Sequence, residues 1–253
     1  MKPVFLVSDI HAGIRDDGDE APRLADFHAL LERARSEGSE LVVLGDLFDF
    51  WFQWREVVPS RHLPWLEALR QTTRGGLPVT LLPGNHDFHL TGLLESHVGL
   101  HLPGDGERRD LLGTRALLHH GDGLDPRERG YRLMRRVFRS RWAQAAFRWL
   151  HPDLGMRLAD HMGGGDRQRT WSGEDLCAYL RRALPEVLRE DDGLMVMGHV
   201  HAAGRFHWRQ TLVVTLPPFM SPARGHATWD GAELAFHYLH PHLAVDAVEE
   251  SLA

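Results

Sequence analysis

Five short motifs carry side chains that could bind metal ions or transfer protons. Their carboxylates, imidazoles and single amide form a mixture of oxygen and nitrogen donors, which suits Mn, Fe, Zn or Co and disfavours Ca. The only cysteine is Cys177, so a thiolate zinc site is excluded. The motifs are Asp9-Ile10-His11, Gly45-Asp46 with Asp49, Gly84-Asn85-His86-Asp87, His120-Gly121-Asp122 and Gly198-His199-Val200-His201.

These donors suggest a site for two divalent cations. Two close cations need a bridging anion, and Asp46, which belongs to the middle of the predicted sheet edge, is the best candidate. Asp9 and His11 are close enough in sequence to reach one cation together, whereas His199 and His201 could divide between the two. Two cations about 3.5–4 Å apart can hold a hydroxide between them and clamp the oxygens of a phosphate ester.

The remaining motif residues complete this prediction. Asn85 offers an amide oxygen and His120 a further imidazole. His86 is adjacent to a ligand without being needed as one, so it could protonate a leaving oxygen or bind a phosphoryl oxygen. We therefore assign the chemistry to His86 and the bridging Asp46. Three carboxylates are expected to hold the imidazoles and turns in place, namely Asp49, Asp87 and Asp122.

The elements that must position the motifs indicate an α/β fold. Each motif follows a short apolar run that is typical of a buried strand. Strands that end at one sheet edge bring the residues that follow them together. We predict strands at 2–9, 41–44, 78–82, 194–198 and 211–215, hairpins at 111–120 and 227–238, helices at 22–37 and 62–71, and a connecting loop at 98–110.

Residues 123–190 differ from the rest because arginines crowd them and no strand–helix alternation occurs. An apolar stripe at helical spacing predicts a basic helix or helix pair, followed by a helix at 173–190. We expect a helical insertion that caps the site, with the triple glycine 163–165 as a flexible joint. Its arginine face is either solvated or contacts phosphate groups or an anionic membrane surface. The stripe consists of Tyr131, Met134, Phe138, Trp142, Ala145 and Trp149.

Candidate substrate contacts come from this insertion and from the aromatic window 48–54. The window follows a ligand-bearing turn, and its rings cannot all point inward on one face, so at least one should reach the mouth of the site. The candidate substrate-binding residues are Trp51, Arg129, Tyr131, Arg132, Arg135 and Arg136.

The overall composition is that of a globular domain spanning residues 1–253. The net charge of −6 argues against a general nucleic-acid-coating role. One cysteine and no signal peptide favour the cytosol. No apolar run approaches the roughly 20 residues of a membrane-spanning helix.

The ordered motifs resemble those of the calcineurin-like metallophosphoesterase family, D-x-H, G-D-x-x-D, G-N-H-D, a later His and G-H-x-H, between residues 9 and 201. The resemblance implies a four-layer α/β/β/α sandwich and two divalent cations, with Mn²⁺ favoured and Fe, Zn or Co as the other possible metals. It implies His86 as the catalytic histidine. One cation would be held by Asp9, His11, Asp46 and His201, and the other by Asp46, Asn85, His120 and His199.

Within that family the chain is most similar to UDP-2,3-diacylglucosamine pyrophosphate hydrolases, in residues 48–52, 84–88 and 120–123 and in the basic insertion. This implies cleavage of the pyrophosphate of a nucleotide-linked lipid at the cytoplasmic face of the inner membrane, under an insertion that cradles acyl chains. The well-known proteobacterial form has Arg at the position of His86, which leaves the substrate open. The alternatives are a soluble phosphodiesterase or phosphatase with the same metals, and a non-catalytic scaffold that kept the fold.

Overall fold

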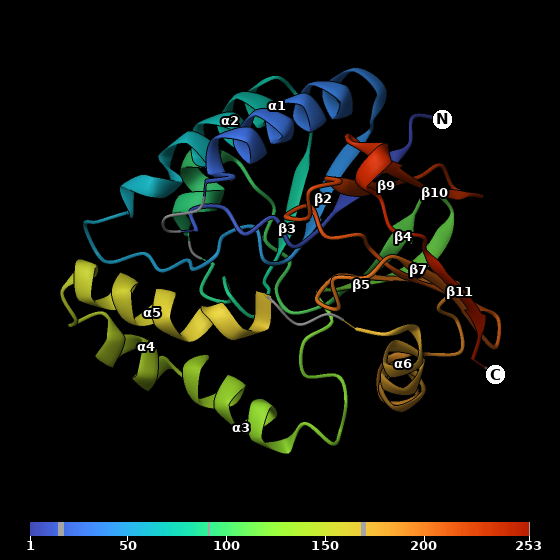
Figure 1. The fold of residues 1–253 in the computed structure, drawn as a ribbon. Coiled ribbons are helices and arrows are strands. Elements are labelled where there is room, and N and C mark those ends of the chain that lie inside the picture. Colours follow the sequence, from blue (N-terminus) through green and yellow to red (C-terminus); the bar gives the residue numbers. More distant parts are fainter. Residues whose placement is uncertain (15–17, 91, 168–170, 253) are drawn as a thin grey trace.

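Two β-sheets form the centre of the structure, a computed structural model that describes residues 1–14, 18–90, 92–167 and 171–252 (Figure 1). The first sheet contains β1 (Val4–Val7), β2 (Glu40–Leu44), β3 (Val79–Leu82), β9 (Gly225–Trp229) and β10 (Leu234–Tyr238), in the order β10-β9-β1-β2-β3. The second contains β4 (Glu107–Leu111), β5 (Thr114–His119), β6 (Leu194–Met197), β7 (Gly204–Trp208), β8 (Thr211–Thr215) and β11 (Val248–Ser251), in the order β11-β7-β8-β6-β5-β4.

Parallel pairing brings the motif-bearing strands to common edges. In the first sheet β1, β2 and β3 are parallel, with Val4 opposite Glu40 and Leu41 opposite Val79. In the second, β5 and β6 are parallel, with Ala116 opposite Leu194. The C-terminal ends of the strands within each set therefore lie side by side, which is where open α/β sheets place their sites.

Helices cover the outer faces of both sheets. Phe27 of α1 (Glu20–Glu37) belongs to one apolar cluster with Phe5, and α2 (Leu63–Arg74) contributes to the same cluster. On the second sheet, Leu180 of α6 (Gly173–Val187) packs with Met195. A third cluster, which includes Leu6, fills the space between the sheets. This is the predicted four-layer α/β/β/α sandwich, and it explains why strands covered on both faces are apolar throughout.

Three further helices lie apart from both sheets and form what we call the cap, α3 (Arg129–Phe138), α4 (Arg141–Phe147) and α5 (Pro152–Arg167) (Figure 1). Ser140 begins α4 because its hydroxyl accepts a hydrogen bond from the Ala143 amide. The cap is tied to the body of the molecule by polar contacts. Trp54 donates its indole hydrogen to the Leu150 carbonyl at 3.1 Å, and Arg61 pairs with Asp160 at 2.9 Å.

Several predicted boundaries were wrong. Gly163 lies inside α5, so the predicted flexible joint is part of a helix, because tertiary context overrides the weak helix propensity of glycine. α6 packs on the second sheet and belongs to its outer layer, not to the cap. The predicted loop 98–110 contains the start of β4, an edge strand with the polar sequence Glu-Arg-Arg-Asp-Leu. β7 and β11 were not predicted.

Shorter helical turns occur at Ser60–His62, Leu94–Val98 and Pro241–Leu243. Among the described residues, no helix combines the length and the apolar character needed to cross a membrane.

Candidate metal centre

The predicted donors meet where strands of both sheets end. Asp9 and His11 follow β1, and Asp46 follows β2. The second sheet contributes His120 after β5 and His201 after β6. Side chains of the five motifs thus converge from sequence positions almost two hundred residues apart, as the sequence pattern predicts.

The backbone at these positions is unusual. Eight non-glycine residues of the described chain have positive φ, and five of them are predicted ligands. Such left-handed conformations cost roughly 1–3 kcal/mol for ordinary residues and cluster at functional sites. At a strand end, the left-handed turn folds the chain back so that the side chain faces the neighbouring strands. The five residues are Asp9 (54°), His11 (49°), Asp46 (51°), His199 (69°) and His201 (50°).

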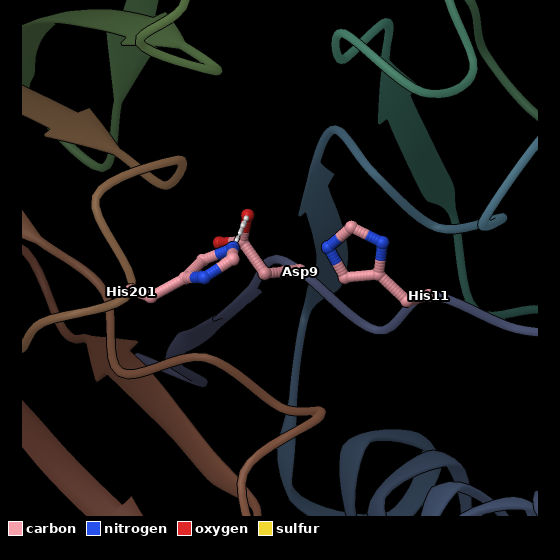
Figure 2. Close-up of side chains that lie close together, drawn as sticks. All are labelled: Asp9, His11 and His201. Atoms are coloured by element: carbon pink, nitrogen blue, oxygen red, sulfur yellow. Dashed lines mark ion pairs between the residues drawn. The ribbon is translucent and has the colours of Figure 1, made fainter. Parts of the chain in front are cut away.

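Distances between the donor atoms are those of a compact polar cluster. Asp46 Oδ2 lies 3.6 Å from His11 Nε2 and 3.4 Å from His120 Nε2, so one carboxylate faces both imidazoles. His201 Nε2 lies 3.3 Å from Asp9 Oδ1, and Figure 2 shows this pair with His11 on the far side of Asp9. Three overlapping sets of donor atoms, each within 4.8 Å of one another, could hold a metal ion, namely Asp9/His11/His201, His11/Asp46/His86 and Asp9/Asp46/His120.

Nearby imidazoles keep two buried carboxylates of this edge ionised. Burial raises the pKa of Asp9, but the hydrogen bond and charge of His201 outweigh it and lower this pKa to about 2. Burial is likewise outweighed at Asp46, where the charges of His120 and His86 hold the pKa well below its usual range. Both carboxylates are therefore ionised at neutral pH. At His199, burial and the charge of His120 lower the pKa to about 4, which keeps this imidazole neutral and able to act as a ligand.

His11 provides a direct test of whether metal ions fit these residues. It is completely buried, and both ring nitrogens make no hydrogen bond with the described part of the chain. Instead they face Asp46 at 3.6 Å and Asp49 at 3.5 Å. A buried imidazole without hydrogen bonds is costly unless something else binds its nitrogens. A divalent cation between Nε2 and the Asp46 carboxylate would bind one of these nitrogens, while the Asp49 carboxylate faces the other, so the donor set fits the implied metals.

The amide of Asn85 connects two imidazoles. Its Oδ1 lies 2.9 Å from His120 Nε2 and 3.1 Å from His199 Nδ1. Whether each ring nitrogen donates a hydrogen bond to this oxygen depends on the tautomer of the ring. The backbone amide of His86 donates to Asp46 Oδ1 at 2.9 Å, and Nδ1 of the His86 ring lies 2.8 Å from the Asp49 carbonyl oxygen. The structure therefore brings Asn85 and His199 to the same edge as the other predicted ligands and places His86 directly beside Asp46.

Asp49, Asp87 and Asp122 support the edge in different ways. Asp49 faces the ring of His11, as described above. The Asp87 carboxylate accepts hydrogen bonds from four backbone amides and so holds the turns after β2 and β3 together. Asp122 contacts the cap, because its Oδ2 accepts from Tyr131 Oη at 2.9 Å and from Arg135 Nε at 2.6 Å. It therefore fixes α3 to the turn that carries His120.

The cap residues that were predicted to bind substrate divide according to helix phase. Tyr131 and Arg135, four residues apart, face the site and line its cavities. Arg129, Arg132 and Arg136 line neither the metal-centre cavity nor the apolar cavity described below, so their contact with a substrate stays a prediction.

Trp51 also differs from its prediction. It is 1% exposed and its ring stacks on Phe48 in the core between α2 and the first sheet. The ring cannot reach a substrate from there. Phe50 and Phe52, from the same aromatic window, line a cavity beside the metal centre instead.

Two connected cavities open at this edge. The smaller, of about 100 Å³, is lined by Asp46, Asn85 and His86 among others. The larger, of about 510 Å³, lies between the cap and the body and shares Asn85 and His86 with the smaller. Sequence reasoning missed most of its lining, although the apolar stripe of α3 and α4 signalled part of it. Its aromatic and aliphatic walls come from Phe50, Phe52, Phe88, Met134, Phe138, Phe147, Leu150, Leu158 and Met162.

The chain is similar in sequence to known proteins. A family model described as calcineurin-like phosphoesterase matches residues 2–203. Relatives named UDP-2,3-diacylglucosamine hydrolase include one from Aeromonas salmonicida, 31% identical over 78% of this chain and 76% of its own, and one from Ralstonia nicotianae, 32% identical over 81% and 79%. A relative with the same name from Porphyromonas gingivalis is 32% identical over 62% of this chain and 60% of its own.

Proposed function

Because the chain belongs to the calcineurin-like phosphoesterase family, whose members hydrolyse phosphoester or pyrophosphate bonds with metal ions, we propose that it cleaves the pyrophosphate of a nucleotide-linked lipid. UDP-2,3-diacylglucosamine is the substrate we favour, since several relatives carry its name. The products would be a nucleoside monophosphate and a lipid phosphate.

The observation that carries this proposal is the position of the apolar cavity. Its volume of about 510 Å³ lies in the range of roughly 300–1,000 Å³ for ligand pockets, and it opens directly onto Asn85 and His86. A small soluble phosphodiester has no acyl chain that could fill an apolar cavity beside the metal centre. Acyl chains could enter it while the phosphate attached to the same lipid lies at the metal centre.

Two divalent cations, with Mn²⁺ favoured, would be held by Asp9, His11, Asp46, Asn85, His120, His199 and His201. When bound, they would supply Lewis-acid stabilisation of the phosphoryl oxygens and activation of the attacking water. Asp46 contributes the shared negative charge, because its carboxylate faces His11 and His120 at once.

His86 is the residue that we assign to the leaving group. It is 7% exposed, lines both cavities, and is oriented by the Asp49 carbonyl at 2.8 Å from its Nδ1. If Nδ1 donates to that carbonyl, Nε2 is the nitrogen available to the substrate. From this position it can hydrogen-bond a phosphoryl oxygen or give a proton to the departing oxygen. Arg139 also lines the apolar cavity, where it donates to the Gly84 carbonyl at 3.2 Å and pairs with Asp105 at 3.0 Å.

Peripheral contact with the inner membrane, at its cytoplasmic face, is part of the proposal because the substrate is a lipid. Trp142, in the first turn of α4, and Trp149, two residues beyond the end of α4, are 87% and 91% exposed. Each follows an exposed arginine, Arg141 and Arg148. Indole rings beside basic groups are typical of interfacial membrane binding.

Filling the apolar cavity tests the function. Ala146 lines the cavity, whereas its neighbour Ala145 does not. Ala146→Trp should lower kcat/KM about tenfold or more for a long-chain UDP-diacylglucosamine and less for a short-chain analogue, while Ala145→Trp should behave as the unmodified chain. Release of UMP by the Mn²⁺-loaded protein is the readout. Rapid cleavage of bis(p-nitrophenyl) phosphate without turnover of any lipid-linked nucleotide would refute the proposal and favour a soluble phosphodiesterase.

A further inference from the structure

A second, polar cavity adjoins the metal centre through residues that do not line the apolar cavity. It has a volume of about 410 Å³ and extends between residues 125–128 and α6. Glu128 and Trp171 line both this cavity and the small cavity at the metal centre, so the two spaces adjoin each other. The apolar cavity instead adjoins the metal centre through Asn85, His86 and Tyr131. We call the polar space the α6 groove.

The walls of the α6 groove are held by buried contacts. Asp125 is 3% exposed, and its Oδ2 accepts from Arg182 Nε at 2.7 Å. Tyr179 is 1% exposed, donates its hydroxyl hydrogen to the Gly121 carbonyl, and packs its ring edge-to-face against Trp171 with centroids 5.2 Å apart. A ligand would therefore meet a groove whose ring and guanidinium are already positioned, which lowers the cost of binding.

The chemistry of the groove excludes a phosphate as its preferred occupant. Three carboxylates and two guanidinium groups line it, and one of those guanidinium groups is already paired with Asp125. The net charge of these lining groups is slightly negative, so the groove does not attract an anion. A neutral group with hydroxyl and N–H donors and a planar ring fits better, because carboxylates accept from ribose hydroxyls and aromatic rings stack on bases.

We propose that the α6 groove binds the nucleoside of the substrate, with the base against Trp171, a ribose hydroxyl toward Glu128 and a base carbonyl toward Arg182. This inference rests on the proposed function, because it divides one substrate among three spaces. The lipid lies in the apolar cavity, the pyrophosphate at the metal centre and the nucleoside in the α6 groove. The order of the cavities matches the order of the groups in the substrate.

Binding measured by calorimetry on the full Mn²⁺-loaded chain tests the groove without relying on turnover. The probes are UMP and inorganic phosphate. UMP should bind more tightly than phosphate, and Trp171→Ala should weaken UMP binding about 5- to 100-fold, as stacking on an aromatic residue predicts, with phosphate binding changed less than twofold. Trp171→Phe should recover most of the loss, which a folding defect would not.

Arg182 has a matched control in its neighbour on α6. Arg182→Ala should weaken UMP binding, whereas Arg181→Ala, at an exposed position that does not line the groove, should not. The groove is refuted as a nucleoside site if Trp171→Ala and Arg182→Ala bind UMP like Arg181→Ala, or if UMP binds the unmodified chain no more tightly than phosphate.

The proposed function fails differently. Absence of UMP release from any lipid-linked nucleotide, together with UMP binding that depends on Trp171, would remove the lipid substrate and leave the groove as a nucleotide site. If the protein releases UMP and Trp171→Ala leaves the KM of this reaction unchanged, the proposed function is retained and the α6 groove is rejected as the nucleoside site.

Discussion

The contact between Gly84 and Asp46 allows a sharp test of the metal centre. A Cβ atom added at Gly84 would lie 2.0 Å from Asp46 Oδ1 and 2.4 Å from the Asp46 amide nitrogen. Real Cβ atoms essentially never come closer than 3.0 Å to such atoms, so the carboxylate must move by about 1 Å. Metal–ligand distances tolerate only roughly 0.2 Å, and Asp46 faces both His11 and His120. Gly84→Ala should therefore weaken the binding of both cations at once.

We expect kcat/KM of the Gly84→Ala protein to fall about 100-fold, since a displacement of about 1 Å in a positioned group costs roughly this factor. Bound Mn²⁺ should fall as well, measured by elemental analysis after equilibrium dialysis. Gly92→Ala is the matched control, because nothing lies within 4 Å of its added Cβ. Thermal unfolding should remain cooperative in both variants. If Gly84→Ala retains full Mn²⁺ binding and activity, Asp46 is not the shared ligand that we describe.

Three further predictions concern pH, membranes and metals. Burial and the nearby charges of His237 and Arg33 lower the pKa of His226 to about 3, so the unfolded chain binds one more proton below pH 6.5. The free energy of unfolding should fall by about 2 kcal/mol more between pH 7 and pH 5 in the unmodified chain than in His226→Phe, and equal losses in denaturant titrations would contradict this. The double variant Trp142→Ala/Trp149→Ala should lose most of its binding to vesicles containing anionic lipid in a sedimentation assay while still cleaving a soluble short-chain substrate, and unchanged sedimentation would reject the membrane surface. Chelation with EDTA should abolish hydrolysis and Mn²⁺ should restore it, whereas activity that persists in the metal-free protein, verified by elemental analysis, would refute metal-dependent chemistry.

The sandwich and the convergence of the donors could be predicted because each depends on a local pattern. An apolar run that ends in a ligand motif predicts both a buried strand and the edge where it stops. The order of the motifs identifies the strand ends that must meet. His11 illustrates the limit of this reasoning, because only coordinates show that both of its buried ring nitrogens lack hydrogen bonds within the described residues.

The rest could not be predicted because it depends on tertiary packing. The arginines of α3 are similar in type and close in sequence, yet helix phase turns Arg135 toward Asp122 and Arg136 toward solvent. Trp51 and Phe52 are neighbours in one aromatic window, and only the path of the chain decides that the first is core and the second cavity wall. The helix that contains Gly163 is another example, because packing rather than local propensity sets its extent.

The clamp that Asp122 makes on Tyr131 and Arg135 joins the cap to the turn that carries His120. One carboxylate therefore connects the cavity under the cap to the turn that carries a predicted metal ligand. Under the proposed function, a lipid in that cavity and cations at the metal centre would be linked through Asp122. Such linkage is reciprocal, so each would change the affinity for the other by the same factor.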